Sequence, residues 1–221
     1  MNEMPTLHYV YDPFCGWCFG AAPLLSAAAH VPGLRIALHG GGLLTGDRAR
    51  SMDDDWREFV RPHEQRITTL TGQGFGSRYR DIAQFDRSLR LDSGPPTAAM
   101  LAAEAAGGLG LAVLKRLQKA YYLDGRPIAD HDELLRQASE LGLPDTAFEA
   151  ALDQAMSGLG RHFAASHALL QSLGARGYPT LALQRGDQLE LLPLGQWLGR
   201  PAPLRTALEQ KLGLTGLAAA A

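Results

Sequence analysis

The sequence lacks three features that would point to particular partners or compartments. The formal net charge is only -2 over 221 residues, so nothing indicates the basic surface of a nucleic-acid-binding protein. No apolar run is long enough to span a membrane, and residues 1–6 have neither the basic nor the apolar region of a secretory signal. With an apolar fraction of 46%, the chain is expected to be a soluble cytoplasmic protein with a sizeable core.

Cysteine is also scarce. The chain has two, Cys15 and Cys18, and both lie in the segment "FCGWCF" at residues 14–19. A reducing compartment argues against a structural disulfide, and a three-residue offset closes too small a loop to constrain the unfolded chain much. The pair is therefore predicted to serve chemistry.

Apolar spacing and turn residues predict an α/β chain whose middle is helical. Strands are predicted at residues 6–11, 34–39, 180–184 and 188–192, the last two forming a hairpin. Helices are predicted at residues 19–30, 56–70, 97–106, 109–123, 132–141, 146–156 and 159–173, with a last one around residues 204–212. Pro62 should bend or break the second helix, and residues 40–42, all glycine, should form a flexible loop.

The position of the cysteines between a strand and a helix suggests how they work. Cys15 is expected at the first turn of the helix, where unpaired amide N–H groups and the positive end of the helix dipole stabilise a thiolate. Cys18 follows three residues later on nearly the same face, within disulfide reach. Cys15 is then suited to attack a disulfide, and Cys18 to resolve the mixed intermediate.

Two other interpretations of the pair stay open. Zinc needs four ligands, and His162 and His167 offer a second pair, although positions five apart do not share a helical face. Alternatively, both thiols are buried and inert, as the flanking Phe14 and Phe19 would allow.

The segment "YDPFCGWCFGAAPLL" (residues 11–25) resembles the active-site strand, turn and helix of the thioredoxin superfamily. That family has a proline five residues after its second cysteine, where this chain has Pro23. It also has a cis-proline facing the cysteine pair. The segment "GYPTLAL" (residues 177–183) supplies Pro179 for this role, so the Tyr178–Pro179 peptide bond is predicted to be cis.

Pro179 lies 164 positions after Cys15, which excludes plain thioredoxin and matches the DsbA-like branch. The wording "DPFCGWCFG" is most similar to cytoplasmic predicted protein-disulfide isomerases and FrnE-like members, and "LDSGPPTAAMLAAEAA" (residues 91–106) resembles one of their inserted helices. The resemblance implies a thioredoxin fold with a large inserted all-helical domain. Residues 1–50 and 175–221 would form the thioredoxin-like domain, and residues 51–174 the insert.

The resemblance also implies roles for residues around the pair. The catalytic residues would be Cys15 and Cys18, the substrate-binding residues Trp17, Tyr178 and Pro179, and the supporting residues Phe14, Gly16 and Asp12. The backbone of Tyr178 would pair with an extended substrate chain. No metal is expected.

The chain departs from its relatives at three points near the pair. Many thioredoxin relatives have a buried acid on the first strand, six residues before the first cysteine, where this chain has Tyr9. Asp12 is nearer in sequence, but its charge would oppose a thiolate at Cys15. DsbA has Pro-His between its cysteines and this chain has Gly16-Trp17, so a strongly oxidising potential is not implied.

The leading prediction is an enzyme, a thiol–disulfide oxidoreductase or protein disulfide isomerase. Its partners would be protein or small-molecule disulfides and a thiol electron donor or acceptor. No bound cofactor is expected, and glutathione is left open as a co-substrate. A second hypothesis is a glutathione-dependent isomerase or transferase of the kappa or 2-hydroxychromene-2-carboxylate isomerase type, with Asp92-Ser93 near the glutathione. A third is a non-enzymatic binding or chaperone module.

Overall fold

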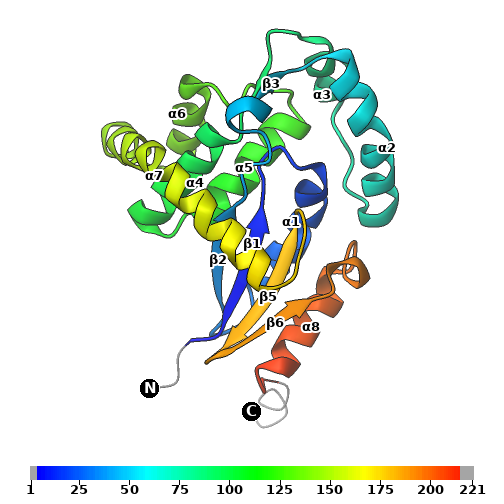
Figure 1. The fold of residues 1–221 in the computed structure, drawn as a ribbon, viewed down its shortest axis with the longest axis vertical. Helices are drawn as coiled ribbons and strands as arrows, with labels where there is room; N and C mark the ends of the chain where they lie inside the picture. Colours follow the sequence, from blue (N-terminus) through cyan, green and yellow to red (C-terminus); the bar gives the residue numbers. More distant parts are fainter. Residues whose placement is uncertain (1–3, 215–221) are drawn as a thin grey trace.

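The computed structural model describes residues 4–214 (Figure 1). Its main sheet has four strands in the order β2-β1-β5-β6. These are β1 (Thr6–Tyr11), β2 (Arg35–Gly40), β5 (Thr180–Arg185) and β6 (Gln188–Leu192). β1 pairs with β2 in parallel, whereas the β1–β5 and β5–β6 pairs are antiparallel. The α/β architecture and the carboxy-terminal hairpin are therefore as the sequence predicts.

Helices cover both faces of this sheet. Leu7, Tyr9 and Tyr11 of β1 point to one face, where they share a buried cluster with α1 (Gly16–Ala28) and α8 (Pro201–Lys211). The long helix α7 (Asp145–Ser172) crosses the other face in Figure 1. Because side chains alternate along a strand, β1 contributes to both packing layers.

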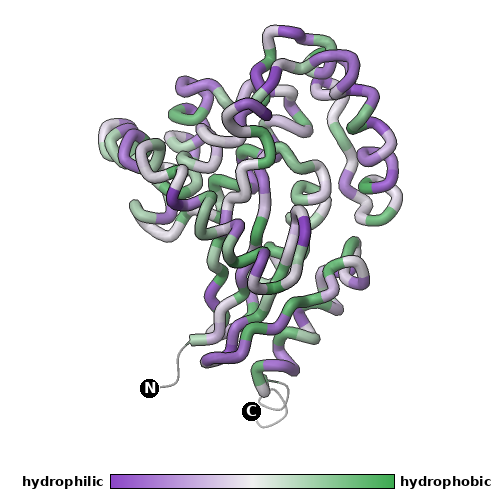
Figure 2. Tube along the Cα trace, in the orientation of Figure 1, coloured by the Kyte–Doolittle hydropathy of each residue, from purple (hydrophilic) through white to green (hydrophobic). Residues whose placement is uncertain are grey.

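The segment between β2 and β5 is largely helical. Besides α7 it contains α2 (Asp54–Thr71), α3 (Ser77–Asp81), α4 (Gly94–Gly107), α5 (Gly110–Tyr122) and α6 (His131–Ser139). The same segment contains two strands of two residues each that were not predicted, β3 (Arg50–Ser51) and β4 (Arg90–Leu91), which pair with each other. It also contains short 3-10 helices at Gly46–Arg48 and Ala83–Phe85, and a third 3-10 helix, Leu194–Gln196, follows β6. α2 stands at the outer side of the molecule and is largely hydrophilic in Figure 2. Among the described residues, no helix is both long and apolar enough to cross a membrane.

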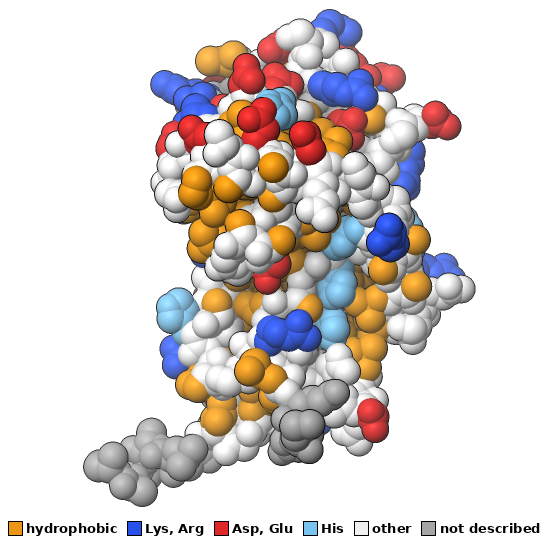
Figure 3. All heavy atoms as spheres, turned by 90° about the vertical axis from the view of Figure 1, so that its left-hand side faces the viewer, with side chains coloured by type: hydrophobic (Ala, Val, Ile, Leu, Met, Phe, Trp, Pro, Cys, Tyr) orange, Lys and Arg blue, Asp and Glu red, His pale blue; other side chains and the backbone are white. Residues whose placement is uncertain are grey.

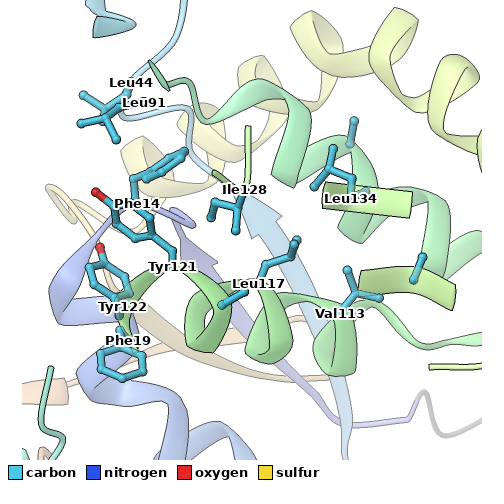
Figure 4. Packing of buried hydrophobic residues seen from close by; sticks show 14 of the residues in the cluster. Phe14, Phe19, Leu44, Leu91, Val113, Leu117, Tyr121, Tyr122, Ile128 and Leu134 are labelled. Atoms are coloured by element: carbon cyan, nitrogen blue, oxygen red, sulfur yellow. The ribbon is translucent and has the colours of Figure 1, made fainter. Parts of the chain in front are cut away.

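Side chains of the cysteine-bearing segment enter the core of the helical segment. Phe14 and Phe19 belong to the same buried cluster as Tyr121 and Tyr122 of α5. Figure 4 shows these four rings together, with both tyrosine hydroxyls pointing to the same side. The Phe14 ring meets Tyr121 edge-on at 4.9 Å, and Phe19 stacks on Tyr122 at 4.9 Å. The turn before α1 is therefore fixed by aromatic packing against the insert.

α2 is continuous through Pro62, so the helix does not break there, while the alternative of a bend at Pro62 stays a prediction. Its first turn is capped by Asp53, whose carboxylate accepts from the N–H of Trp56 at 2.7 Å. The prediction for the last helix of the insert was wrong. α7 is one helix, whereas the sequence suggested two helices separated near residues 157–158. Gly158 and Gly160 lie inside it, and each costs only about 1 kcal/mol relative to alanine. Packing of α7 along α4 and β2 outweighs that cost.

Two glycine substitutions test this view of the helices. At Gly160, an exposed site inside α7, an added Cβ meets nothing within 4 Å. We expect Gly160→Ala to raise the free energy of unfolding by about 0.5–1 kcal/mol. At Gly20, inside α1, an added Cβ would lie 2.8 Å from Cγ2 of the buried Ile67. Gly20→Ala should therefore lower that free energy by about 1–3 kcal/mol. Urea unfolding followed by circular dichroism measures both. A Gly160→Ala variant no more stable than the wild type would contradict the helical backbone at that position, and a Gly20→Ala variant as stable as the wild type would contradict the close contact with Ile67.

Candidate active site

Cys15 is the residue that precedes the first turn of α1, as the sequence predicts. Its backbone is extended, and its carbonyl accepts from the N–H groups of Cys18 at 2.9 Å and Phe19 at 3.1 Å. The Cys15 side chain therefore lies beside the amide groups and the positive dipole end of the helix. Its Sγ faces the carbonyl oxygen of Tyr178 at 3.6 Å.

The two thiols differ in exposure. Cys15 is 8% exposed and Cys18 is 0% exposed, so Cys15 is the more accessible. Burial, and then the neighbouring Cys15, raise the pKa of Cys18 well above its ordinary value. One contact acts the other way, because the Asp12 N–H donates to Cys18 Sγ at 3.5 Å. Cys18 is thus a shielded thiol behind the accessible one.

Asp12 lies at the centre of the hydrogen bonds around the site, fully buried. One carboxylate oxygen accepts from the Phe14 N–H at 2.9 Å and from the Ser93 hydroxyl at 2.9 Å, and the other accepts from the Leu43 N–H at 2.7 Å. Burial raises the pKa of Asp12 to about 6, although these hydrogen bonds and Arg48 oppose the shift. Ser93, suggested from the sequence as a neighbour of glutathione, instead links the insert to Asp12.

Tyr9 occupies the position where many thioredoxin relatives have a buried acid. It is buried, and its hydroxyl donates to the carbonyl oxygen of Cys18 at 3.3 Å. Burial raises the pKa of Tyr9 well above its ordinary value. Tyr9 is therefore a neutral hydrogen-bonding group next to the backbone of Cys18.

The Tyr178–Pro179 peptide bond is cis, as predicted. The Tyr178 hydroxyl donates to the carbonyl of Gly41 at 2.8 Å, and His167 Nε2 approaches the same oxygen at 2.7 Å. An added Cβ at Gly41 would lie 2.1 Å from the Tyr178 ring. The glycine loop is therefore not an open flexible segment: residues 40–42 are buried, and glycine is needed there because the tyrosine ring packs directly on the backbone.

The histidines singled out from the sequence do not join the cysteines. His162 Nε2 accepts from the Gly40 N–H at 2.9 Å, so His162 and His167 both bond to the glycine loop. No cluster of three or more His, Cys, Asp or Glu side chains placed to hold a metal occurs within residues 4–214. The zinc alternative therefore has no ligand set in that part of the chain.

His8 of β1 and His39 of β2 form a pair. His8 Nδ1 lies 2.9 Å from His39 Nε2, and its other ring nitrogen lies 2.8 Å from Oε1 of Gln184. Burial lowers the pKa of His39 to about 4. Figure 3 shows histidine side chains in a row on this side of the molecule. The hydrogen bonds of the His8 and His39 rings are with each other and with Gln184 rather than with either sulfur.

The side chain of Trp17, between the two cysteines, is held by α2. Its indole N–H donates to His63 Nδ1 at 3.3 Å, and the Arg66 guanidinium lies 5.6 Å from the ring centroid. This contact could not be predicted from the sequence, because nothing around residue 63 distinguishes that segment from an ordinary amphipathic helix. Gly16 makes the approach of α2 possible, since an added Cβ would lie 3.1 Å from Cδ1 of Ile67.

A cavity of about 350 Å³ opens beside Cys15, between the cysteine turn and α2. Its walls are almost entirely apolar; Trp17, Leu43, Trp56, Tyr122, Gly177 and Tyr178 are among its lining residues. His63 and Glu64 are its main polar groups. A larger hollow of about 810 Å³ lies between α2 and residues 74–85, but neither cysteine lines it. The smaller cavity is the candidate substrate site because it contains the accessible sulfur.

The raised pKa of Asp12 predicts a pH effect on stability. Between about pH 4, where an unfolded aspartate ionises, and about pH 6, the folded chain holds a proton that the unfolded chain has lost. The contribution of Asp12 to the free energy of unfolding should therefore fall by up to about 3 kcal/mol as pH rises through this window. Urea unfolding of the wild type and Asp12→Asn at several pH values gives this contribution as their difference. A difference that stays constant from pH 4 to 7 would contradict the assignment.

Comparison with known proteins places this site in a family. A family model described as a DSBA-like thioredoxin domain matches residues 6–203. Two structures of the cytosolic disulfide reductase DsbM from Pseudomonas aeruginosa, the second with GSH, are 49% and 47% identical to this chain, with TM-scores of 0.89 and 0.85. Each covers 95% of this chain and 100% of its own. No curated protein sequence matches the chain.

A structure of a 2-hydroxychromene-2-carboxylate isomerase is 16% identical, with a TM-score of 0.56, and covers 96% of this chain and 100% of its own. At that identity the likeness extends to the fold alone. The family match spans nearly the whole chain, including the cysteine turn, the insert and the Tyr178–Pro179 segment. This chain belongs to the DSBA-like thioredoxin domain family of thiol–disulfide oxidoreductases.

Proposed function

We propose that this protein is a dithiol reductase that uses Cys15 as the attacking thiol and Cys18 as the resolving thiol. The observation that carries the proposal is the difference in their placement. Cys15 Sγ opens onto a cavity and faces the Tyr178 carbonyl, while Cys18 is fully buried behind it. A sulfur buried in this way has no access to an external disulfide, but it can attack one formed at Cys15.

The reaction has two exchange steps. The Cys15 thiolate attacks one sulfur of the substrate disulfide; the substrate S–S bond breaks, and the first thiolate leaves with the bonding electrons. Cys18 then loses its proton and attacks the Cys15 sulfur, which releases the second substrate thiol and leaves a Cys15–Cys18 disulfide. The substrate is reduced by two electrons and the enzyme is oxidised by two.

Glutathione is proposed as the thiol that restores the enzyme. Two glutathione molecules would reduce the Cys15–Cys18 disulfide and leave as glutathione disulfide, which balances the cycle. The support is indirect: DsbM, at 47% identity, has been solved with GSH. The same relative is described as a cytosolic disulfide reductase, which favours reduction over isomerisation and a cytoplasmic location for this chain as well.

Trp17, Tyr178 and Pro179 would hold the substrate. The Tyr178 carbonyl lies next to the attacking sulfur, and Trp17 forms a wall of the cavity. Phe14, Gly16 and Asp12 would support the turn through packing and hydrogen bonds.

Removal of each cysteine separates the two steps. In Cys18→Ala the first step should proceed and the second should fail, so that partner proteins or glutathione accumulate on Cys15 in cells. The adducts should appear as reducible bands on a non-reducing gel and as added mass. Cys15→Ala should carry none, and should lose reduction of insulin by at least about a hundredfold, since the attacking thiolate is the essential nucleophile.

The same variants test the alternatives. A glutathione-dependent isomerase would keep its turnover in Cys18→Ala and form no protein adducts. A chaperone would protect a cysteine-free client equally well in the wild type and both variants. Absence of adducts in Cys18→Ala, together with a wild type that reduces neither insulin nor small disulfides, would refute the reductase.

The order of thiol reactivity gives an independent check. Because Cys18 is fully buried and its pKa is raised, we expect iodoacetamide at mildly acidic pH to label Cys15 first by at least about tenfold. Peptide mapping by mass spectrometry measures the ratio. Faster labelling of Cys18 would reverse the two roles.

A further inference from the structure

The charge around the Cys15 cavity suggests what its substrates have in common. Selectivity at this cavity rests on the proposed function, because it decides which disulfides Cys15 attacks. The cavity itself is apolar, so it offers little to distinguish one small disulfide from another. Selectivity must then come from charged groups at its edge.

One such group is Arg66 on α2. Its guanidinium lies 5.6 Å from the centroid of the Trp17 ring, and the indole of Trp17 lines the cavity. No carboxylate of residues 4–214 lies within 4 Å of the Arg66 guanidinium, whereas Arg57 on the same helix pairs with Asp54 at 2.7 Å. Stacking on an aromatic ring holds a guanidinium in place and leaves its N–H donors free.

The second group is Arg48, which belongs to the short helix after the glycine loop. Its Nη2 donates to the Gly42 carbonyl at 2.8 Å. Gly42 directly precedes Leu43, which lines the cavity, so this hydrogen bond holds Arg48 beside the cavity wall. Among the described residues it too has no carboxylate within 4 Å. Arg48 is thus bonded to the backbone next to Leu43, and Arg66 lies over Trp17. Leu43 and Trp17 both line the cavity.

The acidic groups near the cavity do not cancel these charges. Glu64 lines the cavity, but one of its oxygens already accepts from Tyr79 at 2.7 Å and Gln84 at 2.9 Å, and Arg61 and Arg80 lie near it. The Asp12 carboxylate is fully buried and occupied by its three donors. Oε1 of Glu64 and both oxygens of Asp12 are therefore engaged by other donors, whereas Arg48 and Arg66 have no carboxylate partner among the described residues.

We propose that Arg48 and Arg66 select disulfides whose thiol halves carry carboxylates. In the first exchange step, the half that remains bonded to Cys15 lies in the cavity, with a carboxylate within reach of one guanidinium. Guanidinium–carboxylate hydrogen bonds supply the affinity and the orientation that the apolar walls do not. The substrate class is thus carboxylated thiols in disulfide form, among which peptide disulfides with free acidic groups are included.

Three small disulfides of similar size test the selectivity: dithiodipropionate (anionic), hydroxyethyl disulfide (neutral) and cystamine (cationic). Reduced enzyme is mixed with each in a single turnover, and formation of the Cys15–Cys18 disulfide is followed by acid quench and mass spectrometry. Each rate constant is divided by that of dithiothreitol with the same disulfide, which removes differences in intrinsic reactivity. The expected order is anionic, then neutral, then cationic, with a spread that shrinks as salt is added.

The variants Arg48→Gln and Arg66→Gln should each lower the normalised rate for dithiodipropionate about threefold to tenfold and leave the neutral disulfide unchanged. Arg57→Gln is the matched control: it makes the same change on α2, at a guanidinium that is already paired with Asp54 and lines the larger hollow, and it should alter no rate. Equal rates for the three disulfides, or a preference that survives in both variants, would overturn the assignment while leaving the reductase intact. Failure to react with any of them would instead overturn the proposed function, and the selectivity with it.

Discussion

The buried carboxylate of Asp12 is the interaction on which the rest of the site depends. It joins three separate parts of the chain: the turn before Cys15 through Phe14, the loop after β2 through Leu43, and the start of α4 through Ser93. Burial of a charge without an ion-pair partner is costly, and the raised pKa of Asp12 expresses that cost. The cost is offset by three donors, which act together with the aromatic packing of Phe14 and Phe19 to hold the cysteine turn against the insert.

The hydrogen bonds of Asp12 also help to position the Cys15 sulfur relative to the carbonyl oxygen of Tyr178. Leu43 follows the glycine loop, and that loop accepts the Tyr178 hydroxyl on Gly41. Asp12, in the turn before Cys15, is therefore connected to Tyr178 through two hydrogen bonds to the backbone of residues 41–43. The carbonyl of Tyr178 faces the Cys15 sulfur. Since the ring of Tyr178 leaves no room for a side chain at Gly41, small shifts in the loop would be transmitted directly to this carbonyl.

Local features of the site could be predicted from the sequence, and long-range ones could not. Short segments of the sequence were enough to predict the cysteine pair, the start of the following helix and the cis bond before Pro179, and the structure has these features as expected. The contacts of Trp17 with His63 and of Asp12 with Ser93 join residues 46 and 81 positions apart, and neither partner has a distinctive local pattern. The sequence predicts two helices in place of α7 for a related reason. The glycines near its middle suggest a break, and the packing on α4 and β2 that outweighs their cost is not visible in the sequence. The division into residues 1–50 with 175–221 and 51–174 stays a prediction, and residues 1–3 and 215–221 lie outside the described part.

The fold by itself does not choose between a disulfide reductase and an isomerase, because structures described as a disulfide reductase and as a 2-hydroxychromene-2-carboxylate isomerase both have it. The second thiol is what distinguishes them. An enzyme that only positions a glutathione thiol needs one side chain at the helix start, and a second cysteine one turn later would have no task. Here Cys18 is placed beneath Cys15, removed from solvent, and bonded to the backbone of Asp12. Burial keeps such a thiol protonated until a disulfide forms next to it. That restraint suits a resolving group, since a negative charge held permanently at Cys18 would oppose formation of the attacking thiolate at Cys15.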